Sequence, residues 1–198
     1  MTGKPDYTRI GITRQLQAMG ADKYEIGIFD RDRDVMIPRY WTGEMILKSI
    51  AYLRRQNVDG KDIFIRPEGS MGLVFFDDLT RGTLKQLEAD GLRPAVVIQS
   101  SPDNFHGWVR VSDTAIPENL ATAVSKVLAK TYGGDQNSAD WRHYGRLAGF
   151  TNRKPKYIDD SGRSPFVTLS DGNGNLAKSA GDLLDKAAVY LEEMKERE

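Results

Sequence analysis

Two pairs of β-strand segments follow one another along the chain with no helical segment between their members. Residues 62–66 and 72–76 form one pair, residues 94–99 and 105–111 the other, and all four are rich in β-branched and aromatic residues. Parallel neighbours would need a crossover of a dozen or more residues, usually a helix. The sequence therefore predicts an α+β fold with a mainly antiparallel sheet flanked by helices.

Helical segments surround these strands. A strand is predicted at 24–29 from its period-two alternation, and the charged segment 30–39 is predicted to be a turn. Ser138 is predicted to begin a helix. The other predicted elements are helices at 7–19, 42–57 (with Thr42 as its cap), 80–89, 117–131 and 180–198, and a strand at 165–169.

The length and composition are those of one globular domain. The chain has 198 residues, 39% of them hydrophobic and 28% charged, which is enough for a substantial core. It has no cysteine, which excludes disulfides, a thiol nucleophile and a cysteine-ligated zinc site. No apolar run reaches the ~20 residues that span a bilayer, and the N-terminal sequence lacks the apolar segment of a secretory signal. We therefore expect a cytoplasmic protein with no membrane partner.

The charges sum to zero but are unevenly distributed. A basic domain is the usual sign of nucleic-acid binding, so zero net charge counts mildly against it. Residues 141–158, however, contain no acid and several cations. These cations are Arg142, Arg146, Arg153, Lys154 and Lys156. The chain is neutral overall and carries a local basic segment.

A hydrophobic run that stops on two carboxylates is the first candidate for chemistry. The run 73–76 reads as a strand, and Asp77 and Asp78 follow it directly. Mg²⁺ typically takes one or two carboxylates together with substrate phosphates. Successive strand side chains point to opposite faces, so both acids can serve one metal only if the chain bends there. A structural interpretation is equally compatible, with Asp78 capping the next helix and Asp77 in a turn.

The second candidate is a turn between two strands. It has the sequence SSPDN at 100–104, and His106 lies on the second strand. Serine hydroxyls and turn amides suit phosphate oxygens, and a histidine can donate to a phosphate or stay neutral as an acceptor. By itself, the pattern is more typical of an ordinary β-turn with a partly exposed histidine.

The third candidate is the segment 132–156, where Asp135 and Asp140 precede the cations. Arginine binds phosphates in a bidentate manner, and aromatic rings offer faces on which bases stack. The alternative is a solvated basic surface beside core aromatics, but Gly145 and Gly149 beside charged residues disfavour a purely core helix. The aromatic residues in and beside the segment include Trp141, Tyr144, Phe150 and Tyr157.

These segments resemble a known family. The string HYGRLAGFTNRK at 143–154 is long and specific. Shorter matches are RQL at 14–16, AMG at 18–20, YEIG at 24–27, IRP at 65–67, GLV at 72–74, DDL at 77–79 and SP at 101–102. The chain resembles, to about residue 156, the RepB-type primases of mobilisable plasmids, a branch of the archaeo-eukaryotic primase superfamily.

The resemblance implies an archaeo-eukaryotic-primase-like fold and a DNA primase catalytic domain that makes primers on single-stranded DNA at plasmid replication origins. It implies two-metal nucleotidyl transfer with Mg²⁺ or Mn²⁺. The expected partners are a single-stranded template with a hairpin initiation site, nucleoside triphosphates and a replication helicase. Residues 1–178 are expected to form the catalytic domain, and 179–198 a charged helix that leads towards a further helical domain.

The resemblance also implies roles for individual residues. The expected catalytic acids are Asp77, Asp78 and Asp135, and Asp140 is a further candidate metal ligand. Ser101 and His106 fall where the phosphate-binding motif of the superfamily lies. The residues expected to bind triphosphate or template are Ser101, His106, Arg142, His143, Arg146, Asn152 and Lys154.

Two alternatives remain open. One is a catalytically idle module that grips the hairpin DNA of an origin through the basic segment, in which case Asp77 would be dispensable. The other is a relaxase or nuclease-like phosphodiesterase. The chain has two histidines and so cannot form the three-histidine cluster of a relaxase.

Overall fold

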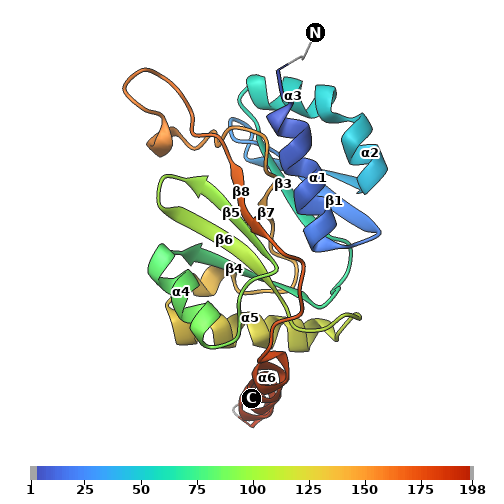
Figure 1. Ribbon diagram of the computed structural model, residues 1–198, viewed down its shortest axis with the longest axis vertical. Helices are drawn as coiled ribbons and strands as arrows, with labels where there is room; N and C mark the ends of the chain where they lie inside the picture. Colours follow the sequence, from blue (N-terminus) through green and yellow to red (C-terminus); the bar gives the residue numbers. More distant parts are fainter. Residues whose placement is uncertain (1–3, 197–198) are drawn as a thin grey trace.

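The chain forms two four-stranded sheets, each antiparallel throughout (Figure 1). The computed structural model describes residues 4–196. Sheet A has the order β2-β1-β3-β7, with β1 at Lys23–Asp30, β2 at Val35–Thr42, β3 at Asp62–Pro67 and β7 at Gly145–Arg146. Sheet B has the order β4-β6-β5-β8, with β4 at Leu73–Leu79, β5 at Val96–Ser101, β6 at Asn104–Arg110 and β8 at Thr168–Gly172.

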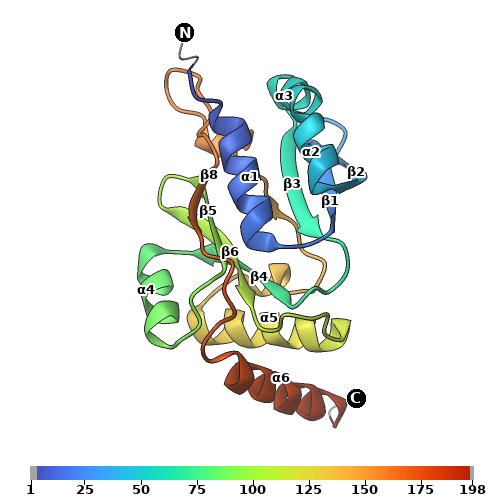
Figure 2. The same cartoon turned by 45° about the vertical axis from the view of Figure 1, so that its right-hand side comes forward.

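The helices divide between the two sheets. Helices α2 (Gly43–Lys48) and α3 (Ile50–Val58) lie beside sheet A, and α4 (Arg81–Ala89), α5 (Glu118–Tyr132) and α6 (Ala180–Lys195) lie below sheet B (Figures 1 and 2). Helix α1 (Tyr7–Met19) lies between the two sheets and packs against β5 and β8. Two short 3₁₀ helices, η1 (Gln136–Ser138) and η2 (Pro155–Tyr157), interrupt the segment between α5 and β8. None of the helices within residues 4–196 has the length and apolarity that a membrane crossing needs.

Period-two alternation in sheet B separates two hydrophobic clusters. On β4, Phe75 packs with α1 and sheet A, whereas Val74 and Phe76 pack with α4, α5 and α6. Trp108 and Val109 of β6 divide in the same way. Sheet B is therefore buried on both faces, and its inner face meets sheet A. The space between the two sheets is where the candidate residues gather.

Several sequence predictions need correction. Strand β2 begins at Val35, because the turn occupies only 31–34 and closes with Asp34 in the left-handed region (φ 53°). The predicted helix 42–57 is two helices divided at Ser49. No α-helix begins at Ser138, because the Asp135 and Asp140 side chains accept hydrogen bonds from nearby backbone N–H groups and compete with helix formation.

Gly145 is required where the chain passes over the core. A Cβ atom built there would lie 2.2 Å from Cη2 of the buried Trp108 ring and 2.9 Å from Cε2 of Phe75. We expect Gly145→Ala to lower the free energy of unfolding by about 1–3 kcal/mol through overpacking. Gly181→Ala on α6 is the control, because no atom lies within 4 Å of its added Cβ. It should leave stability unchanged or raise it by up to ~1 kcal/mol. Urea unfolding of both variants measures the difference, and equal stabilities would contradict this packing.

Candidate active site

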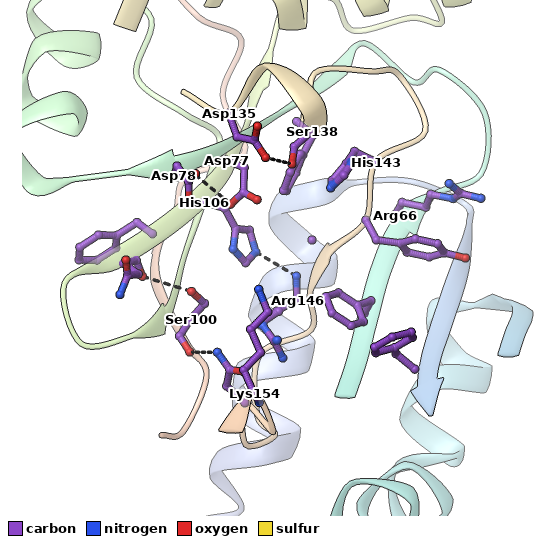
Figure 3. A pocket seen from close by; sticks show the side chains of 18 of the residues that line it. Arg66, Asp77, Asp78, Ser100, His106, Asp135, Ser138, His143, Arg146 and Lys154 are labelled. Atoms are coloured by element: carbon purple, nitrogen blue, oxygen red, sulfur yellow. Dashed lines mark hydrogen bonds between the residues drawn. The ribbon is translucent and has the colours of Figure 1, made fainter. Parts of the chain in front are cut away.

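A cavity of about 710 Å³ opens between the two sheets and is lined by side chains from both (Figure 3). Strands β1, β2, β3 and β7 form one wall, β4, β5 and β6 form the other, and the segment 135–157 supplies the remainder. All the predicted site residues except Ser101 line it: Asp77, Asp78, His106, Asp135, Asp140, Arg142, His143, Arg146, Asn152 and Lys154.

A β-bulge turns the acidic pair towards one partner. Phe76 of β4 pairs with Gly107 of β6, and Leu79 pairs with Phe105, so Asp77 and Asp78 together oppose the single residue His106. Asp78 adopts the left-handed conformation (φ 57°), which aspartate tolerates better than most residues. The bend that both acids need to serve one metal is therefore present. Asp78 does not cap helix α4, because Thr80 does so by accepting from the Thr83 N–H.

A close backbone approach brings in the third acid. A Cβ atom at Gly134 would lie 2.1 Å from Cε2 of Phe76 and 3.1 Å from the carbonyl oxygen of Asp77. Only glycine fits this contact, and it lets Asp135 follow directly beside β4. The Asp135 carboxylate is held by the Asn137 N–H and the Ser138 hydroxyl, each at 2.8 Å.

The acids have the chemistry of a divalent-cation site. Burial raises the pKa of Asp78, and the charges of Asp77 and Asp135 raise it further, while Lys154 and Lys156 oppose them. A divalent cation would relieve this repulsion between carboxylates. Within residues 4–196 no three histidine or acid side chains converge tightly enough to hold a metal by themselves. The arrangement therefore fits a hard divalent cation that is held by carboxylates together with the phosphates of a ligand.

His106 is buried and neutral. Its Nε2 accepts the backbone N–H of Arg146 at 3.0 Å, which leaves the ring proton on Nδ1. Burial, together with the positive charge of Arg146, lowers the pKa of His106 to about 3. Among the described residues the His106 ring makes this one hydrogen bond, at Nε2, and the side chain lines the cavity. The ring can thus donate one hydrogen bond without carrying a charge.

Asp140 and His143 form a local turn. Asp140 accepts the Arg142 N–H at 2.7 Å, and its other oxygen lies 3.4 Å from Nδ1 of His143. The His143 ring stacks on Phe75 with centroids 5.1 Å apart. Asp135 is among the charges that raise the pKa of Asp78, and it stays the predicted third acid, with Asp140 as the further candidate.

Ser101 lies outside the cavity. Its side chain is buried and accepts from Nδ2 of Asn104 at 2.8 Å within the β5–β6 turn. The register of β5 shifts between Gln99 and Ser101, which leaves Ser100 as the extra residue. Ser100 lines the cavity instead, and its carbonyl accepts from Nδ2 of Asn152 at 2.9 Å. Asn152 consequently fixes the loop to β5.

The basic segment contains cations of two kinds. Arg142, Lys154 and Lys156 are exposed and line the cavity. Arg153 instead donates to the carbonyl oxygens of Asn57 at 2.8 Å and Val58 at 3.2 Å, at the end of α3. Its guanidinium therefore anchors the loop and is not free for DNA.

The sequence matches the RepB DNA-primase N-terminal domain family over residues 30–194. The chain belongs to this family. It is 40% identical over 192 residues to Mobilization protein A of Escherichia coli, covering 96% of this chain and 27% of that protein. It is 29% identical over 170 residues to a DNA primase of Acidithiobacillus ferrooxidans, covering 79% of this chain and 48% of that protein. The chain thus spans about a quarter and about half of these relatives.

Solved structures confirm the fold of this RepB-family domain. The catalytic domain of primase RepB′, crystallised in complex with initiator DNA, superposes with a TM-score of 0.89 at 38% identity, over 98% of this chain and 100% of that one. The domain of a cyanophage S-2L primase-polymerase gives a TM-score of 0.62 at 19% identity, over 92% and 100% of the two chains. The predictions of an α+β antiparallel fold and of family membership are confirmed.

Sequence reasoning missed one wall of the cavity in this RepB-family domain. Arg66 bonds Glu25 at 2.6 and 2.9 Å, and its guanidinium lies 4.1 Å above the Tyr144 ring. The Tyr144 hydroxyl also donates to Glu25. Burial raises the pKa of Tyr144, and the bond to Glu25 raises it further. These residues lie in the strings YEIG, IRP and HYGRLAGFTNRK, but nothing in the sequence shows that residues 25, 66 and 144 meet.

The buried His106 makes the stability of this RepB-family domain pH-dependent. Its pKa in the folded state lies below the ordinary 6.5, so the unfolded chain binds more protons and stability falls as the pH drops below about 6.5. We expect a loss of roughly 2 kcal/mol between pH 7 and pH 4.5. His106→Gln keeps an acceptor but cannot titrate, so the dependence should flatten in that window. Urea unfolding at several pH values measures this, and equal slopes in both proteins would contradict a neutral His106.

Proposed function

We propose that the chain is the catalytic domain of a DNA primase that joins nucleoside triphosphates into primers on single-stranded DNA. The observation that carries this proposal is the bulge that turns Asp77 and Asp78 towards the neutral His106 in a cavity edged by cations. Membership in the RepB primase family and the 38% identity to the RepB′ catalytic domain support it.

Asp77, Asp78 and Asp135 would hold Mg²⁺ or Mn²⁺, with Asp140 at the margin of the site. When bound, the metal lowers the pKa of the primer 3′-hydroxyl and neutralises the charge that develops on the triphosphate. His106 donates its Nδ1–H to a phosphate oxygen and stays neutral while it does so. Arg146 and Lys154 supply positive charge next to the acids, and His143 holds Asp140. Positioning and electrostatics of this kind carry most of the catalysis in phosphoryl transfer.

The partners follow from the same proposal. Because RepB′ was crystallised with initiator DNA, we propose a single-stranded template with a hairpin initiation site at a plasmid origin. Nucleoside triphosphates are the second substrate, and a replication helicase is a further proposed partner. The reaction would take place in the cytoplasm, where plasmid DNA is replicated. Residues 1–178 are the proposed catalytic domain, with 179–198 leading to a further helical domain.

Asp77→Asn should abolish primer synthesis. The substitution keeps the shape of the side chain and removes the charge of a metal ligand, so the loss should exceed the ~10–100-fold typical of groups that only support a ligand. Affinity for single-stranded DNA should stay nearly unchanged. Labelled nucleotide incorporation on single-stranded DNA with Mg²⁺ or Mn²⁺, and no added primer, measures synthesis.

The control for this experiment is Asp103→Asn. Asp103 is an exposed aspartate at the β5–β6 turn that lies outside the cavity, so synthesis should stay at the wild-type level. An idle DNA-binding module predicts no synthesis by the wild type, and that result would reject the enzyme. Synthesis that does not depend on Asp77 would instead reject Asp77 as a metal ligand.

Template binding should depend on the exposed cations. Five phosphate contacts on single-stranded DNA would give a salt slope of roughly −3.5, but Arg146 and Arg153 are engaged within the protein, and three contacts give roughly −2.1. Replacing Lys154 and Lys156 by alanine should weaken binding and reduce the slope by about 1.4. Fluorescence anisotropy with a labelled oligonucleotide from 50 to 200 mM salt measures the affinity and its salt slope.

Lys130 and Lys186 form the matched control pair. Both are exposed, and neither lines the cavity. Their replacement by alanine should leave the slope unchanged. If both double variants lost affinity equally, or if the wild type bound DNA independently of salt, the template would lie elsewhere.

A further inference from the structure

One carboxylate holds the wall of the cavity opposite the acids. Asp62, the first residue of β3, has a fully buried side chain (0% exposed). It accepts from Nη1 of Arg146 at 2.5 Å, from Nη2 of Arg31 at 2.7 Å and from the backbone N–H of Arg153 at 2.7 Å. Although burial opposes ionisation, these three donors outweigh it and lower the pKa of Asp62. The carboxylate is therefore charged and joins two arginines that are distant in the sequence.

Both guanidiniums keep an unused donor. Among the buried polar side-chain atoms of the described residues, only Nη2 of Arg146 and Nε of Arg31 lack a hydrogen-bond partner. Each arginine also stacks on an aromatic ring, Arg146 at 4.8 Å from the Phe64 centroid and Arg31 at 5.2 Å from that of Phe29. A buried donor without a partner is costly, so the pair is suited to an acceptor that arrives with a ligand.

The charges do not balance at this wall. Two guanidiniums share the single negative charge of Asp62, which leaves one positive charge in excess. Both arginines line the cavity, and Arg146 is close enough to the acidic site for Asp77 to raise its pKa, although burial is the larger effect and lowers it. An anion between this wall and the acids would meet the surplus charge on one side and a metal on the other.

We propose that Asp62 is a positioning residue that fixes Arg31 and Arg146 as a clamp for the phosphates of the incoming nucleoside triphosphate. This inference rests on the proposed function and adds two residues, Asp62 and Arg31, to its site. Phosphate oxygens are the ligand chemistry, because guanidiniums bind them in a bidentate manner. The other source of such oxygens is the DNA backbone, but Arg146 is buried in the cavity and Arg31 is only partly exposed, whereas exposed lysines edge the opening.

The test separates these sources with three variants. Asp62→Asn removes the charge that holds the pair, and Arg31→Gln removes one cation at a position whose side chain is 35% exposed. Arg31→Lys restores the positive charge but not the planar guanidinium that can bind two phosphate oxygens at once. The matched control is Asp171→Asn, which disrupts the Arg93–Asp171 pair (2.9 Å), remote from the cavity. Each protein is checked for folding by circular dichroism.

Isothermal titration measures binding of dATP with Mg²⁺ and of a single-stranded oligonucleotide, and inorganic tripolyphosphate is the competitor. Asp62→Asn and Arg31→Gln should weaken dATP binding, and raise its KM in primer synthesis, by roughly tenfold or more, since each loses a charge-assisted contact. The kcat and DNA affinity should change little. Tripolyphosphate should compete with dATP in the wild type and poorly in both variants. Arg31→Lys should recover part of the loss, and Asp171→Asn should behave as wild type.

The outcomes distinguish the two proposals. If the variants bind dATP as well as the wild type, or lose only DNA affinity, the clamp is wrong even where primer synthesis stands. If the wild type makes no primers but binds dATP in a manner that depends on Asp62 and Arg31, the primase proposal fails and the clamp stands. Should Asp62→Asn not fold, Arg31→Gln decides the question with the same measurements.

Discussion

Strand β4 uses two residues to pass the single residue His106 of β6, and the geometry of the whole cavity depends on this bulge. Without it, strict alternation would send Asp77 and Asp78 to opposite faces of sheet B, one of them into the apolar cluster under α4 and α5. With it, both acids can act together, and Gly134 lets Asp135 approach over Phe76. The bond from the Arg146 N–H to His106 then fixes the distance between sheet B and the edge of sheet A.

The cavity has two poles that the neutral His106 separates. Carboxylates collect at the end of β4, while Arg31 and Arg146 collect around Asp62 at the start of β3. A charged histidine between them would add to the cationic pole and repel Arg146, and burial keeps the ring neutral at physiological pH. A triphosphate with its metal carries both signs of charge and is complementary to this arrangement. The shape of the cavity alone would not favour such a ligand. The electrostatic potential of its two charged ends does.

Local motifs were visible in the sequence, whereas contacts between distant segments were not. The strand ending in Asp77-Asp78 and the string at 143–154 identified most of the cavity, because each is continuous along the chain. Ser101, expected from the resemblance to bind phosphate, lies outside the lining of this cavity, and Ser100 lines it instead, next to a register shift after Gln99 that the sequence does not reveal. Arg153 looked like a ligand for DNA, but only the tertiary structure shows that it caps α3. Asp62 looked like an ordinary first residue of a strand, since its three donors come from residues 31, 146 and 153.

Fold by itself does not decide between a primase and an idle DNA-binding module, because the likeness to the cyanophage domain at 19% identity concerns the fold alone.

The energetic cost of the site does bear on the choice between these two functions. Asp78 is held in a left-handed conformation beside two other acids, His106 is buried at a cost that grows as the pH falls, and two buried arginine donors are left without partners. Strain and unsatisfied groups of this kind cost stability and concentrate at functional sites. A surface that only grips DNA needs exposed cations such as Lys154 and Lys156, and it gains nothing from converging acids. Because Asp78, His106, Arg31 and Arg146 line one cavity, their cost is better explained by a ligand that arrives with a metal and phosphates, which is what primer synthesis requires.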